Sequence, residues 1–298
     1  MADLLFYTEC PSCYSAHIAK TLTTVDYTVS QMPFEIWHCN DCSLRFTQNV
    51  PTLHDIGRYY QSENYISHTD TNKGIVNRLY RVVRTYTLKN KRRTISGFTG
   101  LRRGKLLEVG AGTGAFASYM QQSGWQVSGL EPDEQARQKA SELYSIELQD
   151  SATLFHFSEN QFDAITLWHV IEHVHSLHEY LGQLKKVLKP GGFIFIAVPN
   201  YTSYDATFYK EFWAAYDTPR HLYHFCPIAM KRLLQNHGLQ LRSIQPMWFD
   251  SFYVSLLSEK YKTGRSNLIR GFWNGALSNL KALSKKEKAS SLIYVITK

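Results

Sequence analysis

Apolar runs alternate with amphipathic stretches through the second half of this chain. The runs predict strands at 105–109, 126–130, 162–167 and 192–198, and the stretches between them predict helices near 114–123, 133–144 and 176–188. This alternation is typical of a parallel β-sheet with helices on both faces, and ligands bind such sheets at the carboxyl ends of the strands. The sequence therefore predicts an α/β fold.

Two further apolar runs, LQLRSIQPMWF and the final SSLIYVITK, predict two more strands. The helix before them, CPIAMKRLLQNHG, has Pro227 in its first turn and closes on Gly238, although Cys226 is a poor N-cap. An aromatic segment at 200–226 and a polar helical one at 251–289 fall outside the strand-helix alternation. We interpret both as insertions that are free to cover a substrate.

The composition is that of a globular protein. Of 298 residues, 44% are hydrophobic and 19% charged, so disorder of the whole chain is excluded. The start, MADLLFYTECPSC, lacks the regions of a secretory signal, and the longest other apolar run, FIFIAV, is too short to span a bilayer. We expect a cytoplasmic protein with no membrane span.

The formal net charge of +8 is concentrated in one segment, because eleven Lys or Arg and no acidic residue lie between Asp70 and Glu108. Apolar residues recur there at helical spacing, which indicates the solvated basic face of a connector helix. The alternative is a docking surface for a phosphorylated substrate or for nucleic acid.

Four of the five cysteines form two CxxC pairs, Cys10 with Cys13 and Cys39 with Cys42, separated by twenty-five residues. This is the spacing of a zinc ribbon, in which four thiolates hold one tetrahedral zinc. About fifty residues bury too little apolar surface to fold alone, and metal binding supplies the missing free energy. Two disulfides are the alternative, but a cytoplasmic compartment keeps thiols reduced. We predict a closed structural zinc site.

A glycine-rich loop follows the first predicted strand of the α/β region. LLEVGAGTGAF places Gly110, Gly112 and Gly114 between a strand and a helix, and the next strand ends in Glu131, twenty-one residues after Gly110. Glycines let the backbone approach a ligand, and an acid at that strand end accepts hydrogen bonds from ribose hydroxyls. The arrangement suits a dinucleotide or an adenosyl ligand, or only a tight turn in some other doubly wound protein.

Glu108 stands directly before the loop, whose glycines run G-x-G-x-G, and this resembles motif I of the class I S-adenosylmethionine-dependent methyltransferases. FDAITLWHVIEHV at 162–174 resembles their fourth strand and its turn, and LKPGGFIFIAVPN at 188–200 resembles their fifth strand. The resemblance implies a Rossmann-like, seven-stranded sheet with an antiparallel last strand, preceded here by a small zinc ribbon. It also implies a set of cofactor-binding positions: Glu108, Gly110, Ala111, Gly112, Gly114, Glu131, Pro132, Asp150, Trp168 and His169.

The stretch YDTPRHLYHF, 216–225, follows the fifth predicted strand. Its surroundings resemble those of the zinc-ribbon sugar methyltransferases, in which an insertion at this point carries a histidine thought to act as base, and that position falls on His221. A hydroxyl acceptor must lose its proton, and histidine has a pKa close to the operating pH. We predict His221 as the catalytic base, with His169 as second choice. Arg220 either binds an anionic substrate group or holds Asp217.

The predicted organisation is a zinc ribbon at 1–55, a helical connector at 56–98 and a methyltransferase domain at 99–298. The predicted function is methyl transfer from S-adenosylmethionine to a small-molecule or glycan-linked acceptor, at oxygen. An RNA or tRNA methyltransferase is one alternative, although the base-stacking motifs of such enzymes are not evident and we do not expect nucleic acid as a partner. A non-catalytic cofactor-binding scaffold is the other.

Overall fold

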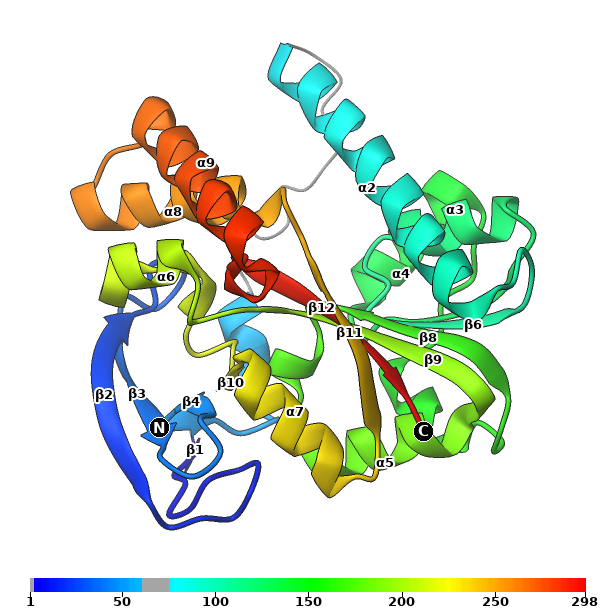
Figure 1. The fold of residues 1–298 in the computed structure, drawn as a ribbon, viewed down its shortest axis with the longest axis horizontal. Helices are drawn as coiled ribbons and strands as arrows, with labels where there is room; N and C mark the ends of the chain where they lie inside the picture. Colours follow the sequence, from blue (N-terminus) through cyan, green and yellow to red (C-terminus); the bar gives the residue numbers. More distant parts are fainter. Residues whose placement is uncertain (1–2, 61–74) are drawn as a thin grey trace.

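The computed structural model describes residues 3–60 and 75–298. The central sheet of this part has the strand order β11-β12-β9-β8-β6-β7 (Figure 1). Its strands are β6 (Lys105–Val109), β7 (Gln126–Leu130), β8 (Phe162–Trp168), β9 (Leu188–Pro199), β11 (Gln240–Pro246) and β12 (Ser291–Thr297). β7, β6, β8 and β9 run parallel, and β12 lies antiparallel between β9 and β11. The α/β prediction is confirmed, including its antiparallel last strand.

The predicted number of seven strands is wrong for the described residues, because the sheet has six. The position beyond β7 holds only a single bridge, between Leu130 and Gln149. Asp150 ends this pairing by capping the 3-10 helix η2 (Ser151–His156), where its Oδ1 accepts a hydrogen bond from the Ala152 N–H at 2.9 Å. An N-cap at this point turns the chain away from the sheet edge after one residue.

Alternating side chains of the central strands pack against two helix layers, as expected for a sheet that is covered on both faces. Leu106, Ala164 and Phe195 face α2 (Ile75–Thr99) and α3 (Ala115–Gln122). Leu107, Ile165 and Ile194 face α5 (Leu177–Val187) and α7 (Pro227–Asn236). α4 (Glu134–Tyr144) packs beside the glycine loop through Ala140. Figure 1 shows the two layers above and below the sheet.

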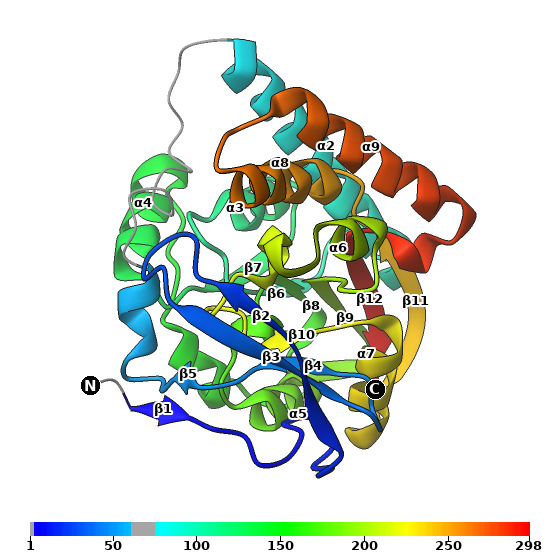
Figure 2. The ribbon, with the colours of Figure 1, turned by 90° about the vertical axis from the view of Figure 1, so that its left-hand side faces the viewer.

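The N-terminal residues form a small antiparallel sheet of β2 (Ile18–Val25), β3 (Pro33–Cys39) and β4 (Arg45–Thr47). A fourth strand, β10 (Tyr223–His224), pairs with β4 and comes from the aromatic insertion (Figure 2). β1 (Leu4–Leu5) pairs with β5 (Val50–Pro51), and the 3-10 helix η1 (Ile56–Tyr60) follows. The ribbon and the insertion therefore share one sheet.

The described parts of the two insertions are mainly helical. The aromatic insertion contains α6 (Tyr204–Tyr209), η4 (Lys210–Phe212) and η5 (Ala214–Tyr216), and η3 (Ile171–His173) forms the turn after β8. The polar insertion contains α8 (Asp250–Thr263), α9 (Leu268–Ser284) and η6 (Lys286–Lys288). α8 and α9 pack side by side and lie over α6 (Figures 1 and 2). No described helix combines the length and the hydropathy needed to cross a membrane.

Candidate active site

The glycine loop joins β6 to α3 through three residues in the left-handed region. Gly110, Gly112 and Gly114 have φ of 70°, 54° and 78°. A Cβ added to Gly110 would lie 2.4 Å from Cγ2 of Val170, whereas a Cβ added to Gly112 would meet nothing within 4 Å. Glycine is therefore needed at Gly110 for close packing, and the space beside Gly112 is open for a ligand.

Glu131 follows β7 and is fixed by the loop opposite it. Its Oε2 accepts a hydrogen bond from the Gly112 N–H at 2.7 Å, and its Oε1 accepts one from the Asp133 N–H at 3.1 Å. Burial raises the pKa of Glu131, although these two backbone donors oppose the shift. The carboxylate is thus held at the carboxyl end of the sheet, beside the open space at Gly112.

Glu108 lies near the carboxyl end of β6 and is 2% exposed. Its Oε2 has no hydrogen-bond partner among the described residues. Burial raises the pKa of Glu108 to about 8, and the positive charge of Lys91 opposes the rise. Lys91 comes from α2, where burial lowers its pKa to about 8 and Glu108 and Asp250 act against the lowering. A buried carboxylate oxygen without a donor fits a ligand that brings an ammonium group.

The other predicted cofactor positions surround this loop. The Ala111 N–H donates to the Leu130 oxygen at 2.9 Å, and the Pro132 oxygen accepts from Arg137 at 2.8 Å. Trp168 is 8% exposed, its Nε1 has no partner among the described residues, and Lys91 Nζ lies 4.3 Å from its ring centroid. Asp150 is exposed and caps η2, with Arg137 Nη1 at 3.4 Å.

His169 begins the turn after β8 in a left-handed conformation, with φ of 58°. Its Nε2 lies 2.9 Å from Oδ2 of Asp250, and its Nδ1 lies 3.4 Å from Oε1 of Glu172. Burial lowers the pKa of His169, but the hydrogen bonds to Asp250 and Glu172 outweigh it and raise the pKa to about 10. Both ring nitrogens are therefore engaged by carboxylates, and the ring is protonated at neutral pH.

His221 lies beside the same turn, although it belongs to the aromatic insertion. Its ring contacts that of His173 edge to face, with centroids 4.5 Å apart. The insertion is tied to the turn by the Leu222 N–H, which donates to the Glu172 backbone oxygen at 2.8 Å. His221 Nδ1 lies 2.9 Å from the Ala215 oxygen, and its Nε2 is 3.9 Å from Asp217. Its Nε2 thus has no close hydrogen bond among the described residues.

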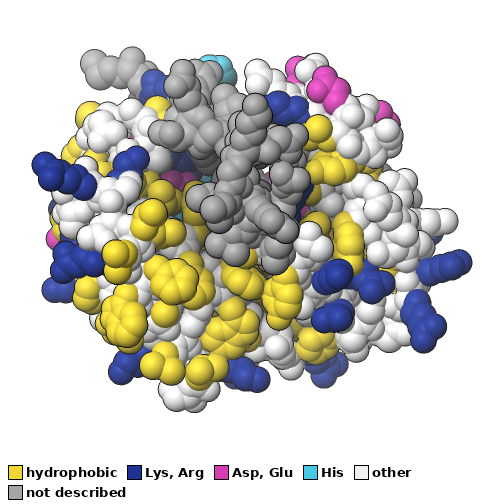
Figure 3. Space-filling view, turned by 90° about the horizontal axis from the view of Figure 1, so that it is seen from above, with side chains coloured by type: hydrophobic (Ala, Val, Ile, Leu, Met, Phe, Trp, Pro, Cys, Tyr) yellow, Lys and Arg dark blue, Asp and Glu magenta, His cyan; other side chains and the backbone are white. Residues whose placement is uncertain are grey.

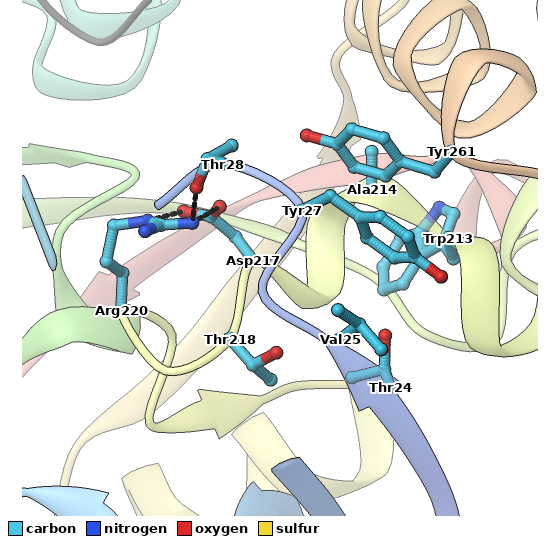
Figure 4. A pocket seen from close by; sticks show the side chains of 10 residues that line it. All are labelled: Thr24, Val25, Tyr27, Thr28, Trp213, Ala214, Asp217, Thr218, Arg220 and Tyr261. Carbon is cyan, nitrogen blue, oxygen red and sulfur yellow. Dashed lines mark hydrogen bonds and ion pairs between the residues drawn. The ribbon is translucent and has the colours of Figure 1, made fainter. Parts of the chain in front are cut away.

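Arg220 is buried at the seam between ribbon and insertion, and its side chain is 1% exposed. It donates to both carboxylate oxygens of Asp217, at 2.7 and 3.0 Å, to Asp26 at 3.2 Å and to the Tyr59 backbone oxygen at 2.8 Å. It also donates to the hydroxyl of Thr28, and Figure 4 shows Arg220 with Asp217 and Thr28 at a small cavity. Of the two roles that the sequence left open, holding Asp217 is the one the contacts support.

The four paired cysteines converge at the other end of the ribbon. Cys10 and Cys42 Sγ atoms lie 3.5 Å apart, those of Cys13 and Cys39 lie 3.6 Å apart, and none of the four is in a disulfide. All four sulfurs are within 4.8 Å of one another. A tetrahedral zinc with Zn–S bonds of about 2.3 Å needs sulfurs about 3.8 Å apart. The donor set and its spacing therefore fit zinc.

Two site residues were missed by the sequence reasoning. Lys91 is one of eleven basic residues in a helical segment, and no spacing distinguishes it from the other ten. Asp250 begins α8, and no motif in the sequence links this helix to the site. Its carboxylate nevertheless forms the shortest contact of the His169 ring. Only the packing of α2 and α8 over the strand ends identifies them.

Comparison with known proteins gives a consistent result. Residues 80–244 match the family described as Methyltransferase domain. A ubiquinone biosynthesis O-methyltransferase from Azoarcus sp. (strain BH72) is 29% identical over 170 residues, 52% of this chain and 72% of that protein. An uncharacterized methyltransferase from Alkaliphilus oremlandii is 34% identical over 99 residues, 32% of this chain and 46% of that protein. A crystal structure of a SAM dependent methyltransferase from Archaeoglobus fulgidus aligns with a TM-score of 0.49 at 20% identity, covering 72% of this chain and 94% of that one.

Proposed function

Since this chain belongs to the methyltransferase domain family and is an S-adenosylmethionine-dependent methyltransferase, we propose that it methylates a hydroxyl oxygen of a small-molecule or glycan-linked acceptor. The relatives named as O-methyltransferases support oxygen as the acceptor atom. The main structural observation is His221, a buried histidine beside the strand ends whose Nε2 is free to accept a proton.

We propose that Glu131 binds the ribose, that the loop from Gly110 to Gly114 lies under the cofactor, and that Glu108 binds its amino group. The fit rests on the open space at Gly112 and on the unpartnered oxygen of Glu108. S-adenosylmethionine, when bound, supplies a methyl group activated by a sulfonium charge. The 200–226 and 251–289 insertions, whose helices pack against one another, would cover the acceptor.

His221 is the better candidate for the base. His169 has carboxylates at both ring nitrogens, Asp250 at 2.9 Å and Glu172 at 3.4 Å, so it has no lone pair to offer. His221 donates its Nδ1 proton to the Ala215 carbonyl, because a carbonyl oxygen can only accept, and this leaves the Nε2 lone pair without a close hydrogen bond, 3.9 Å from Asp217. Positioning of acceptor and base within hydrogen-bond reach would supply most of the catalysis.

The test is the His221→Ala variant, assayed by release of S-adenosylhomocysteine with a panel of nucleotide sugars and phenolic compounds. We expect cofactor affinity within about twofold of wild type and turnover reduced by about two to four orders of magnitude, the usual contribution of a general base. Leu222→Ala is the matched control, since Leu222 is fully buried next to His221 and has no proton to accept. Equal losses in the two variants would show that His221 is only structural.

We also propose that Cys10, Cys13, Cys39 and Cys42 hold one structural zinc. All four sulfurs fill the tetrahedral positions, so no position is left for water or substrate. With the ribbon at 1–55 and the connector at 56–98, the catalytic domain would be 99–298. The zinc then supports the ribbon sheet, which β10 joins to the insertion that carries His221.

A further inference from the structure

Glu172, His173 and His221 form a buried cluster beside the proposed acceptor position. One donor atom from each lies within 4.8 Å of the donor atoms of the other two. Glu172 is fully buried and His221 is 8% exposed. Two of these residues come from the turn after β8 and the third from the aromatic insertion, so the fold brings them together over nearly fifty residues of sequence.

Both histidines are anchored by the same ring nitrogen. Nδ1 of His221 lies 2.9 Å from the Ala215 oxygen, and Nδ1 of His173 lies 3.0 Å from the Arg220 oxygen. A carbonyl oxygen only accepts, so each Nδ1 carries the proton and each Nε2 keeps its lone pair. Histidines that bind metals are typically oriented in this way, with one nitrogen donating to a carbonyl and the other facing the ion.

The carboxylate of Glu172 has few partners for a buried charge. Its Oε2 has no hydrogen bond among the described residues, and its Oε1 has only the contact with Nδ1 of His169. The nearest cation, His169, is 3.4 Å from Oε1 and is bound more closely by Asp250, at 2.9 Å. Burying an ionised carboxylate without partners is costly, so native proteins pair such groups or use them to coordinate metals.

We infer that Glu172, His173 and His221 bind one divalent cation, distinct from the zinc of the cysteine site. Two imidazoles and one carboxylate suit zinc, manganese, iron or cobalt, and three protein ligands leave a position open for an oxygen from outside. This inference rests on the proposed function: the oxygen in that position is the acceptor hydroxyl, and the cation lowers its pKa so that its proton is released to water as the methyl group is transferred. In the cation-bound enzyme His221 is a ligand, and this role replaces the one proposed for it as base.

The test measures Mn²⁺ binding to the full chain that carries one zinc, with no free zinc, cofactor or acceptor present, by the loss of the free Mn²⁺ paramagnetic resonance signal. Manganese prefers nitrogen and oxygen to thiolate, so the cysteine site does not compete. We expect one Mn²⁺ per chain, and at least tenfold weaker binding in Glu172→Gln and His173→Ala. His237→Ala is the matched control, because His237 pairs with His178, which contacts Pro11 of the ribbon. It should bind Mn²⁺ like wild type.

Glu172→Gln has the same shape as wild type, so circular dichroism can verify that it folds. If wild type binds Mn²⁺ only at millimolar concentrations, or if Glu172→Gln binds it unchanged, the inference is overturned and Glu172 serves only as partner of His169. If the enzyme methylates no hydroxyl, the proposed function is refuted, but the measured Mn²⁺ binding still stands. If chelated enzyme that retains its zinc is fully active, the catalytic role of the cation fails.

A second inference comes from α9, whose two faces are reversed from the usual pattern. The side facing the protein is small or polar, with Gly271, Asn274, Gly275, Ser278 and Ala282 buried. The large apolar residues point outward and are 60 to 84% exposed: Leu268, Ile269, Phe272, Trp273, Leu280 and Leu283. Figure 3, which looks down on α8 and α9, shows the hydrophobic side chains gathered on this surface.

Packing fixes this orientation. A Cβ on Gly271 would lie 2.8 Å from the Cα of Leu256, and a Cβ on Gly275 would lie 2.8 Å from the Cα of Phe252, so no larger residue fits between α8 and α9. The buried polar groups are also bonded, Asn274 to the Tyr209 hydroxyl at 2.9 Å and Ser278 to Asp205 at 2.6 Å. The helix cannot turn its apolar side inward without breaking these contacts.

Residues 250–289 contain eight Lys or Arg and three acidic residues. We propose that the outer face of α9 docks on an anionic lipid surface, because an exposed apolar helix face with surrounding positive charge suits the interface of such a membrane. The acceptor of the proposed function would then be reached at the membrane surface.

Vesicle co-sedimentation tests the second proposal. Wild type should bind vesicles of phosphatidylglycerol and phosphatidylcholine, more weakly at high salt, and the variant Ile269→Ser with Trp273→Ser should lose at least tenfold in affinity. Leu53→Ser is the control, since Leu53 is 74% exposed in the ribbon. Absence of vesicle binding, or a dimer in sedimentation that the double substitution dissociates, would overturn the proposal; the second result would show that another copy covers this face.

Discussion

Arg220 offers the sharpest test of the energetics, because one side chain neutralises the buried Asp26 and the partly buried Asp217. In Arg220→Met, the carboxylates of Asp217 and Asp26 lose their hydrogen-bonded cation, and the Tyr59 oxygen loses its donor. Removing one partner of a buried ion pair costs about 3–5 kcal/mol, because a charge is left uncompensated. With an unfolding entropy of about 2.1 cal/mol/K per residue over 298 residues, this corresponds to a fall in Tm of about 5–8 °C.

The assay is differential scanning calorimetry at several pH values, with Arg102→Met as the matched control, since Arg102 is exposed and its loss should change stability by less than about 0.5 kcal/mol. Burial raises the pKa of Asp217, but the Arg220 hydrogen bonds outweigh this and hold the pKa below its ordinary value. The pKa of Asp26 is also lowered, by its backbone bond to Ser30 and by Arg220 against the effect of burial.

The lowered pKa values of the two carboxyl groups determine how the stability difference depends on pH. A carboxyl with a lowered folded-state pKa stabilises fully above its unfolded pKa of about 3.9, and the contribution is lost as the pH falls through the folded value. The Tm difference between wild type and Arg220→Met should therefore be fully present above about pH 4 and narrow as the pH falls below that value. A difference that is below 2 °C, or that does not change with pH, would refute the assignment of Arg220 as a buried counter-ion.

Three further predictions concern the cofactor and zinc sites. Glu131→Ala should weaken S-adenosylmethionine binding about tenfold to a hundredfold in calorimetry, because hydrogen bonds to a charged acceptor contribute about 1.5–3 kcal/mol; unchanged affinity would refute its role at the ribose. Gly110→Ala should destabilise the fold, since its Cβ meets Val170 at 2.4 Å, whereas Gly112→Ala should fold and bind cofactor more weakly; equal Tm losses would contradict this contrast. Wild type should carry one equivalent of zinc in metal analysis, and Cys39→Ser should lose it and have a lower Tm. A variant with full activity and stability would argue against a structural zinc.

The parts of the fold that obey local rules were predictable from the sequence. The glycine loop, the strands and the last antiparallel strand follow from periodicity and from motifs in a fixed order, because one covered sheet imposes that pattern on each strand. The missing strand beyond β7 was not predictable by analogy, since a single capping contact of Asp150 ends it. The positions that pair over long sequence distances carry no pattern at all: Lys91 reaches Glu108 from α2, and Asp250 reaches His169 from α8.

The residues around the proposed base show the same contrast between what local patterns predict and what they do not. The sequence indicated His221 through its neighbours and left Arg220 between two roles, and only the buried contacts with Asp26 and Tyr59 decide between them. The cavity beside Arg220 in Figure 4 is lined from the ribbon and both insertions, a meeting of segments that no local pattern encodes. Contacts between segments that are far apart in the chain therefore cannot be predicted from local sequence patterns.

The pairing of β10 with β4 has a consequence for synthesis on the ribosome. Phe46 pairs with Tyr223, so the ribbon sheet cannot be completed until about 180 further residues have been added. At roughly 5–20 residues per second this interval is about 10–35 s. During that time the edge of β4 lacks its final partner and is open to other strands. Early capture of zinc by the four cysteines would hold the nascent ribbon in register while the chain that completes it is still being made.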